Sequence, residues 1–526
     1  MKQHTKTNLI RIAVVFGLIL IVPISSCKKM DDKLINRDTK KLDPGPYVAG
    51  SYLTGMMQSV IKGNPAWWQQ IQQCLNADLY SGYLATGTPF RGGSFNGTYN
   101  LVDGWNNFAA NTPYDYVLNP FADIKKETKD QGKDMELYAI SLILKVSAAH
   151  RLTDIFGPIP YTKFGTSTAP AFDSQEEVYN AFFSELKEAI DILTTYEDKD
   201  MMGDQVLFAP YDVSTFGGDF KLWVQYANTL RLRLAIRISK ANSGLAKTQG
   251  ELSTSHKYGV LEKMPFGVNC GGPHYLLTLV SWTDVSLNAN MECFLNGYKD
   301  PRASKYATPA TAPASVAGTV KGIRNGIDLV GKSFKGYSFP NVEAGASVIL
   351  MTAAESYFLR AEGTLRGWNM GGSEQSFYEG GIAKSFDQYG LSGASSYYSN
   401  STFVPTDYVD VVDPANNISN TSNITIRWEA GDSFDKKLER IITQKWIANY
   451  PEGQEAWSEF RRTTYPKLFP VVKNDSQGEI APGKFIRRLR YPSYFTTTNP
   501  SGTADAIASK LGGPDKMSTP LWWDKN

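Results

Sequence analysis

Residues 138–161 read YAISLILKVSAAHRLTDIFGPIPY, and their pattern predicts a long helix at the centre of a helical fold. Apolar side chains recur near the 3.6-residue spacing of an α-helix through residues 135–155. The pair Gly157-Pro158 then ends the helix, because both residues disfavour continued helical backbone. A second face is apolar as well, so we expect the helix to be packed between other helices; that face carries Leu142, Ile143 and Val146.

Further helices are predicted on both sides of this one. Apolar and aromatic residues recur at helical spacing in each, and the Asp173-Ser174-Gln175-Glu176 stretch is typical of a helix start. Helical pairs separated by breakers are typical of degenerate tetratricopeptide repeats, although no strict repeat of about 34 residues is visible. We therefore expect a mainly α fold, in which residues of about 47–240 and 346–462 form a tetratricopeptide-like scaffold of helical pairs. The predicted helices cover about 48–62, 173–195, 219–239, 351–367, 373–389 and 434–450.

Two long stretches lack this periodicity. Residues 241–345 are rich in Gly, Pro, Ser and Thr, and residues 390–430 contain several asparagines. Irregular segments of this length are uncommon unless they build a functional surface. We expect them to form the binding regions, and we expect coil from Tyr465 onward.

The N-terminal residues indicate the compartment. Three basic residues (Lys2, Lys6 and Arg11) flank or precede an apolar run of about 13 residues, too short to span a hydrocarbon core of ~30 Å. This is typical of a bacterial export signal. Ile24-Ser25-Ser26-Cys27 follows it and resembles a lipobox, in which the cysteine is acylated and becomes the first mature residue. The alternative is a chance cysteine behind an ordinary signal.

The lipobox interpretation divides the chain into three parts. Residues 1–26 are the expected signal peptide, residues 27–46 a lipidated tether, and residues 47–526 a single large domain. More than one acyl chain on Cys27 would anchor the protein stably in outer-membrane lipid, whereas one chain would not.

Charge and cysteine content exclude two classes of protein. The formal charge is +2, and removal of the three basic residues of the signal lowers it by 3 to −1. A chain this close to neutral lacks the basic surface that nucleic acid requires. The remaining cysteines lack CxxC spacing, so we expect no disulfide framework, although one pair among them stays open; they are Cys74, Cys270 and Cys293.

No enzyme signature is present, so we expect a protein without catalytic residues, resident cofactor or metal centre. His150, His256 and His274 show no metal-binding spacing, and His150 falls within a helix predicted to be buried. Carboxylates such as Asp284 and Asp300 neither favour nor exclude a glycoside hydrolase, because that chemistry depends on separation in space. The segment YEDKDMMGD (196–204) lacks EF-hand spacing; a solvated turn is expected there, with a structural calcium ion as the alternative.

The aromatic residues are the positive indication of a binding site. A sugar ring presents an apolar C–H face bounded by hydroxyls, which suits a flat aromatic ring with amides nearby. NPAWWQQ (64–70), YSGYLATGTPF (80–90), YNLVDGWNNF (99–108) and SWTDVSLNAN (281–290) offer this mixture outside the predicted helices. The alternative for each aromatic is packing against the scaffold, as expected for Trp223, Trp446 and Trp457. The candidate ligand-binding residues are Trp67, Trp68, Tyr83, Tyr99, Trp105, Asn107 and Trp282.

Six segments in order resemble the SusD/RagB family. Residues 138–161 are similar to its helix followed by FGxxPY, and GDFKLWVQYANTLRLRLAIRIS (218–239) resembles the W-x-x-x-A-N-x-L-x-x-R-x-A helix of the SusD-like branch. Together with the lipobox, they identify the chain as a member of that branch. The other segments are GYKDPR (297–302), ESYFLRAEGTLRGW (355–368), FYEGGIAKSFDQYG (377–390) and RRLRYP (487–492).

The resemblance implies four tetratricopeptide-like units and a loop-built opposite side. It also implies a lipid-anchored protein on the outer membrane, facing out, that captures oligosaccharides and delivers them to a SusC-like TonB-dependent transporter. Capture of peptides or another nutrient, an adhesin, and a surface glycoside hydrolase are the alternatives. Beyond GYKDPR, the stretches 241–345 and 390–430 show little similarity to the family, so the ligand is not implied.

Overall fold

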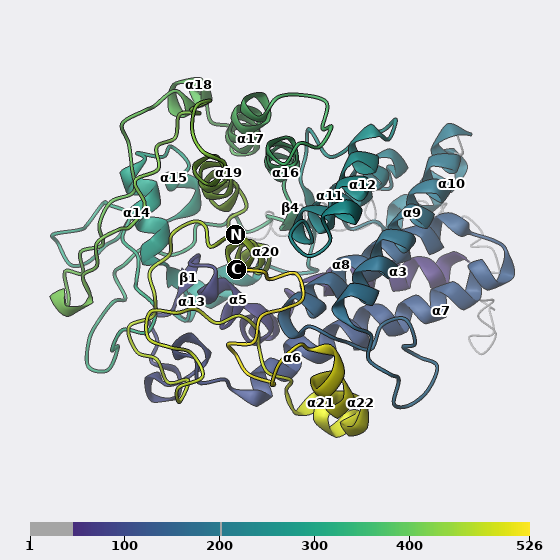
Figure 1. Cartoon of the computed structure of the whole chain (residues 1–526), viewed down its shortest axis with the longest axis horizontal. Coiled ribbons are helices and arrows are strands. Elements are labelled where there is room, and N and C mark those ends of the chain that lie inside the picture. The colour runs from purple at the N-terminus through teal and green to yellow at the C-terminus, as the bar shows by residue number, and fades with distance from the viewer. Residues whose placement is uncertain (1–45, 200–201) are drawn as a thin grey trace, which may run out of the picture. The chain divides into compact units, whose positions relative to one another are not determined.

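The computed structural model describes residues 46–199 and 202–526, and Figure 1 shows their path. The expected signal peptide, Cys27 and nearly all of the tether lie outside this range. The longer helices are α3 (Pro46–Val60), α6 (Asp103–Pro113), α7 (Asn119–Glu127), α8 (Met135–Phe156), α9 (Gln175–Asp198), α11 (Phe220–Arg237), α12 (Ser243–Ser255), α14 (Ala289–Gly297), α16 (Ala353–Leu365), α17 (Glu374–Gln388), α19 (Phe434–Ala448) and α20 (Gly453–Thr463).

Short helices and two small sheets complete the chain. The sheets are antiparallel pairs, β1 (Leu84–Ala85) with β3 (Ser286–Leu287) and β2 (Phe266–Val268) with β4 (Val348–Met351). The mainly α fold expected from the sequence is confirmed. The shorter helices are α4 (Ala66–Gln69), α5 (Ala77–Tyr80), α10 (Met202–Phe208), α13 (Tyr275–Ser281), α15 (Ala303–Tyr306), α18 (Ala394–Tyr398), α21 (Ser493–Thr498) and α22 (Pro500–Asp505).

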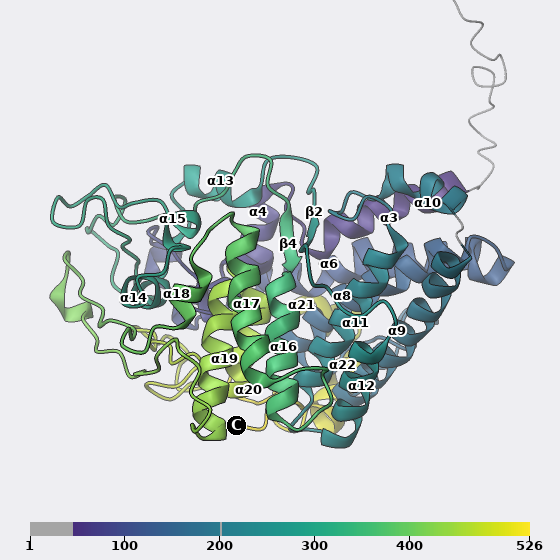
Figure 2. The same cartoon turned by 90° about the horizontal axis from the view of Figure 1, so that it is seen from above.

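Neighbouring helices pack in consecutive pairs. α8 packs against α9, α11 against α12, and α16 against α17, while α9–α11, α11–α16 and α16–α19 contacts join the pairs. Figure 2 shows α16, α17 and α19 running side by side, next to the group that contains α8, α9, α11 and α12. α9 begins with a capping box, in which the Ser174 hydroxyl accepts from the Glu177 amide at 3.2 Å and the Glu177 carboxylate accepts from the Ser174 amide at 2.7 Å.

α8 lies in the core on all its faces, as its two apolar faces predicted. Every residue from Glu136 to Phe156 is buried. His150 is among them, and its Nδ1 lies 3.1 Å from the Val146 carbonyl oxygen. Burial and the nearby cations of Arg233 and Arg151 hold the pKa of His150 well below its ordinary value. The imidazole is a core group, as expected from its position in a helix predicted to be buried.

Buried ion pairs join the helices of the scaffold to one another. Arg233 on α11 donates two hydrogen bonds, of 2.9 and 2.6 Å, to Glu355 on α16. Arg462 on α20 donates to Glu362 on α16 at 2.6 and 2.7 Å and also to Glu459. All five side chains are buried, so each charge depends on its partners for the solvation it has lost.

The stretch 241–345 is more regular than expected. It contains α12, α13, α14 and α15 as well as two strands. α12 lacks an apolar stripe because it packs on α11 and Trp368 through small residues: Ala246 is fully buried, and a Cβ added at Gly250 would lie 2.6 Å from the Trp368 ring. Close helix packing through small side chains leaves no periodic apolar signal in the sequence. The tail after Tyr465 likewise contains α21 and α22.

Two further expectations concern the core. The indoles of Trp223, Trp446 and Trp457 are buried and donate to Asp212, Ser81 and Ile486, so their assignment to the scaffold is confirmed; the distances are 2.8, 2.8 and 3.3 Å. The cysteines at 74, 270 and 293 are buried and free, and no disulfide joins the residues described.

In the described part of the chain, no helix has the length and hydropathy needed to cross a membrane.

Candidate ligand-binding surface

Three of the predicted aromatic stretches come together around the first sheet. The β1–β3 pairing aligns Leu84 with Leu287, which places the residues after β1 beside those before β3. The Thr88 hydroxyl donates to the Thr283 carbonyl at 3.0 Å across this junction. α4, from the stretch 64–70, packs against α13. These contacts bring residues 64–70, 80–90 and 281–290 to one part of the molecule.

Two tryptophans on these packed elements have rings open to solvent. Trp67 on α4 is 43% exposed, and Trp282, directly after α13, is 45% exposed. Few large apolar side chains in the described chain are as exposed, and these two lie on elements that contact each other. Nearby, the Gln70 amide donates to the Asp284 carboxylate at 2.7 Å. We call Trp67, Trp282, Asp284 and Thr88 the aromatic surface; Gln70, which holds the Asp284 carboxylate, is itself buried.

Local backbone geometry explains the exposure of Trp282. α13 buries its apolar side chains Tyr275, Leu276 and Leu279, and Trp282 is the residue that caps its C-terminus. Thr283 then adopts a φ of +61°, a left-handed conformation that is unfavourable for a β-branched residue. The turn directs the chain into β3 and leaves the indole outside the core. Strain of this kind, of order 1–3 kcal/mol, persists where surrounding structure holds it and is concentrated at functional sites.

Trp68 contacts the exposed Trp67 ring and is itself packed against the protein. Its ring is half-buried, lies 5.3 Å from the Trp67 ring, and meets Phe108 edge-on at 4.7 Å. Its indole nitrogen donates to the Thr112 hydroxyl at 2.8 Å. The Lys62 ammonium lies 5.1 Å from the centre of the Trp68 ring, and burial lowers the pKa of this lysine. Trp68 therefore contributes to the position of Trp67 and is itself only partly accessible.

Trp105 belongs to a second aromatic group, on the first turn of α6. Its half-buried ring meets Phe90 and Phe95 edge-on, at centroid distances of 5.9 and 6.4 Å. Phe90 follows Thr88 along the same loop, so this group continues from the stretch that carries part of the aromatic surface. Phe90 was not singled out from the sequence, although its position in the Gly- and Thr-rich segment YSGYLATGTPF was the available signal.

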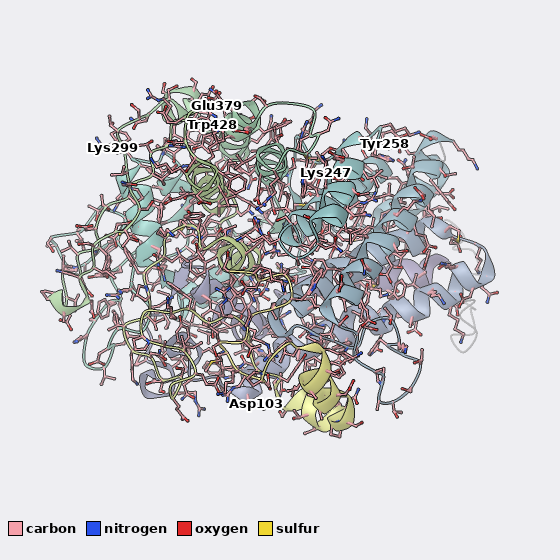
Figure 3. All side chains as sticks on the ribbon, viewed as in Figure 1. Asp103, Lys247, Tyr258, Lys299, Glu379 and Trp428 are labelled. Atoms are coloured by element: carbon pink, nitrogen blue, oxygen red, sulfur yellow. The ribbon has the colours of Figure 1, made fainter. Side chains whose placement is uncertain are left out.

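Asn107 has a role inside the protein. Its side-chain NH2 donates to the Ser493 hydroxyl at 2.9 Å, and its carbonyl oxygen accepts from the Tyr494 amide at 2.7 Å. Asp103, on the same helix, accepts from the Ser493 amide at 2.8 Å and lies beside α21 in Figure 3. The Asn107 amide thus helps to hold α21 against α6. Its expected contact with a ligand has no support from this geometry.

The expectation for Tyr83 and Tyr99 is wrong. Tyr83 is fully buried, and its hydroxyl donates to the Trp446 carbonyl while its ring lies 5.2 Å from the Trp446 ring. Tyr99 is 2% exposed and packs against Tyr80, and burial raises the pKa of its phenol well above the ordinary value. Both residues lie in loops, but these loops fold over the scaffold and place the rings in the core.

No metal site is evident in the part of the chain that the structure describes. Nowhere in 46–199 and 202–526 do three His, Cys, Asp or Glu side chains gather as ligands. The acidic stretch 196–204 includes residues 200 and 201, which lie outside the description, so the calcium expectation there stays a prediction. Asp198, within it, pairs with Lys257 and accepts from the Tyr258 hydroxyl at 2.5 Å.

Comparison with known proteins decides the family. A family model described as SusD-like, SusD and RagB outer membrane lipoprotein, matches residues 30–524. The chain belongs to the SusD-like family. This confirms the resemblance seen in the sequence, and the family description is that of an outer membrane lipoprotein. No curated protein sequence matches the chain.

Solved structures of SusD homologues have the same fold. A chitin-binding SusD homologue from Flavobacterium johnsoniae is 43% identical, with a TM-score of 0.87, over 91% of this chain and 99% of the other. A homologue from Bacteroides vulgatus is 35% identical, with a TM-score of 0.85 and the same coverage. A SusD-like protein from Bacteroides thetaiotaomicron is 32% identical, with a TM-score of 0.83, again over 91% and 99%. The tetratricopeptide-like scaffold expected for this SusD-like chain is thereby confirmed.

Proposed function

We propose that this SusD-like protein is a non-enzymatic, surface-exposed lipoprotein that binds glycan chains and delivers them to a SusC-like TonB-dependent transporter. We further propose that the glycan is of the chitin type, built from β-linked N-acetylglucosamine. The observation that carries the proposal is the pair of exposed tryptophans on contacting elements, Trp67 and Trp282. The chitin-binding homologue from F. johnsoniae, 43% identical over nearly its whole length, supports the choice of glycan.

The chemistry of the aromatic surface suits such a chain. Each indole offers a flat face against which the C–H face of a sugar ring can stack. The acetamido group of each sugar carries an N–H donor, which the half-buried Asp284 carboxylate can accept. A capture protein must also release its ligand, so an affinity between millimolar and micromolar, about −4 to −8 kcal/mol, is sufficient.

Calorimetry with chitohexaose tests the site. Trp67→Ala and Trp282→Ala should each weaken binding about fivefold, which corresponds to roughly 1 kcal/mol for one stacking contact, and the double variant should weaken it further. Phe434→Ala is the matched control, because Phe434 is 42% exposed on α19, outside the aromatic surface. An unchanged affinity of the double variant for chitohexaose would refute this site.

The choice of sugar has its own test. Cellohexaose has the same β-1,4 linkage but lacks the acetamido groups, so it should bind more weakly than chitohexaose. Equal binding of the two would contradict the chitin assignment while leaving a general glycan site in place. Binding of peptides alone would favour the alternative nutrient. Chitohexaose cleavage that disappears with Asp284→Asn would favour a hydrolase.

The anchor and the partner need separate measurements. Cys27→Ser should abolish labelling by radioactive palmitate, whereas Ser26→Ala should keep it; labelling of the Cys27→Ser protein would contradict the lipid anchor. Protease shaving of intact cells should degrade the protein if it faces outward. A SusC-like barrel should copurify with the detergent-solubilised protein, and its absence from that preparation would count against the transporter partnership.

A further inference from the structure

A large cavity lies beyond the C-terminal end of α20 and shares no residue with the aromatic surface. Its volume is about 740 Å³, within the range of roughly 300–1,000 Å³ that is typical of small-molecule sites. Its walls come from the end of α20, the segment after it, residues 479–487 and the C-terminal residues. In Figure 2, α4 and α13 lie along the upper edge of the molecule and α20 toward the lower edge. We call this space the α20 cavity.

The charges around the α20 cavity are mainly positive. Arg461, Lys467, Lys484 and Arg487 line it, together with one carboxylate, Glu479. Arg487 is paired with Asp524, and Glu479 faces Arg490 at 3.4 Å and accepts from the Met517 amide at 3.1 Å. In the described chain, no carboxylate lies within ion-pair distance of Arg461, Lys467 or Lys484. Arg461 is still acted on by the carboxylates of Asp154 and Asp524, so the uncompensated positive charge of the cavity comes from Lys467 and Lys484.

Arg461 is the least expected of these cations, because its side chain is 1% exposed. Its guanidinium donates to the carbonyls of Trp457 and Arg487 and to the Ser458 hydroxyl, at 3.3, 2.8 and 2.9 Å. A guanidinium has five N–H donors, so these bonds leave some of them without a partner. Burial lowers the pKa of Arg461, while the carboxylates of Asp154 and Asp524 act in the opposite direction. The guanidinium also lies 3.7 Å from the centre of the Trp457 ring and 5.0 Å from that of Trp523, so aromatic faces offset part of the cost of burying the charge.

One wall of the cavity is apolar and aromatic. Phe460 and Phe485 meet edge-on with ring centroids 4.7 Å apart, and Leu468 and Ile480 also line the space. A molecule that fits must therefore combine an apolar face with an anionic group. Acidic sugars have this combination, because a pyranose ring has an apolar C–H face and its carboxylate accepts charge-assisted hydrogen bonds from ammonium groups.

We infer that the α20 cavity is a second ligand site, which binds the uronic acid units of an acidic glycan. The ring packs against Phe460 and Phe485, and the carboxylate meets the ammonium groups of Lys467 and Lys484, while the buried Arg461 guanidinium adds positive charge to the wall. The site is independent of the aromatic surface, so it stands even if the chitin proposal fails. A protein with both sites would take neutral and acidic glycans at different places on one chain.

Titration of trigalacturonic acid into the protein at low salt tests the inference. Binding should be at least tenfold tighter than that of maltotriose, an uncharged trisaccharide, and should weaken as sodium chloride is raised. Lys467→Gln combined with Lys484→Gln should weaken it at least tenfold, and Ala481→Trp, which fills a cavity wall, should abolish it. Lys126→Gln, an exposed α7 lysine outside the cavity, and Trp282→Ala should leave it unchanged.

Several results would overturn the inference. Failure of trigalacturonate to bind, or equal binding of maltotriose, would remove the acidic sugar as the ligand. Binding that persists in the double lysine variant, with an unchanged thermal unfolding curve, would place the anion elsewhere. If sodium sulfate displaces trigalacturonate more strongly than sodium chloride does at equal ionic strength, the cavity binds anions in general, and the assignment of uronic acid as its ligand is wrong.

Discussion

Replacement of Asp78 by asparagine should change how the stability of the protein depends on pH. Asp78 lies on α5, shortly before β1, and its side chain is fully buried. Burial raises the pKa of this carboxyl from 3.8 to about 7, while hydrogen bonds from Gln73 and Cys74 act in the opposite direction. Glu452 raises the pKa further and Arg151 lowers it. In the folded protein, Asp78 therefore takes up its proton near neutral pH.

The sign and size of the effect follow from this pKa. A group with a raised folded-state pKa contributes stability that is complete below pH 3.8, and this stability is lost as the pH rises through 7. A difference of about 3 in pKa corresponds to roughly 4 kcal/mol, of which about 2–3 kcal/mol falls between pH 5 and pH 8. The asparagine that replaces Asp78 stays neutral at all these values, and its side-chain oxygen can still accept the 2.7 Å hydrogen bond from Gln73.

Urea unfolding at pH 5, 6, 7 and 8 measures the effect directly. The free energy of unfolding of Asp78→Asn should rise relative to that of the original protein by about 2–3 kcal/mol between pH 5 and pH 8. Asp123→Asn, an exposed substitution on α7, is the control and should leave the difference constant. A free-energy difference between Asp78→Asn and the original protein that does not change with pH would refute the reasoning.

Three further substitutions test the scaffold and its connection to the site. Arg462→Met should lower the free energy of unfolding in urea by about 3–5 kcal/mol, because it leaves Glu362 and Glu459 buried without this partner. Arg427→Met, which breaks an exposed pair, should lower it by less than about 1 kcal/mol. Equal losses in the two variants would contradict the burial argument. Ser174→Ala should cost about 1 kcal/mol through loss of the α9 cap, against less than about 0.5 kcal/mol for the exposed Thr195→Ala on the same helix. Gly322→Ala places a Cβ 2.3 Å from the Asn288 carbonyl oxygen, next to β3, so it should lower stability by about 1–3 kcal/mol and weaken chitohexaose binding. Gly345→Ala, with open space around it, should do neither, and unchanged binding in Gly322→Ala would show that β3 does not position Trp282.

The helices that were predicted well are those whose burial follows a period along the chain. α8, α9 and α11 carry long apolar or aromatic faces, and their observed bounds lie within a few residues of the prediction. α12 was not predicted, because it is buried through Ala246, Gly250 and Ser253 rather than through large apolar side chains. Its helical state depends on the fit of these small residues against α11 and Trp368, which local sequence does not encode.

For the candidate site, the sequence determined the type of residue but not its accessibility. Tyr83 and Trp282 both lie in loop-like stretches rich in polar residues, yet Tyr83 is fully buried and Trp282 is 45% exposed. The difference has two causes. The Trp446 carbonyl, which is distant in the sequence on α19, accepts from the Tyr83 hydroxyl, whereas the left-handed turn at the adjacent Thr283 leaves Trp282 outside the core. The residue types at Tyr83 and Trp282 indicate neither the hydrogen bond to Trp446 nor the turn at Thr283.

The sequence by itself determined the family and the helical class, because motifs and helical periodicity are local patterns. The lipid anchor at Cys27 stays a prediction from the same kind of pattern. Only the tertiary structure decided which aromatics form a surface, because the β1–β3 pairing and the packing of α4 on α13 join residues more than 200 positions apart. The α20 cavity is likewise a product of folding. Its cations extend from Arg461, in the last turn of α20, to Arg487, and only the folded chain gathers them around one space.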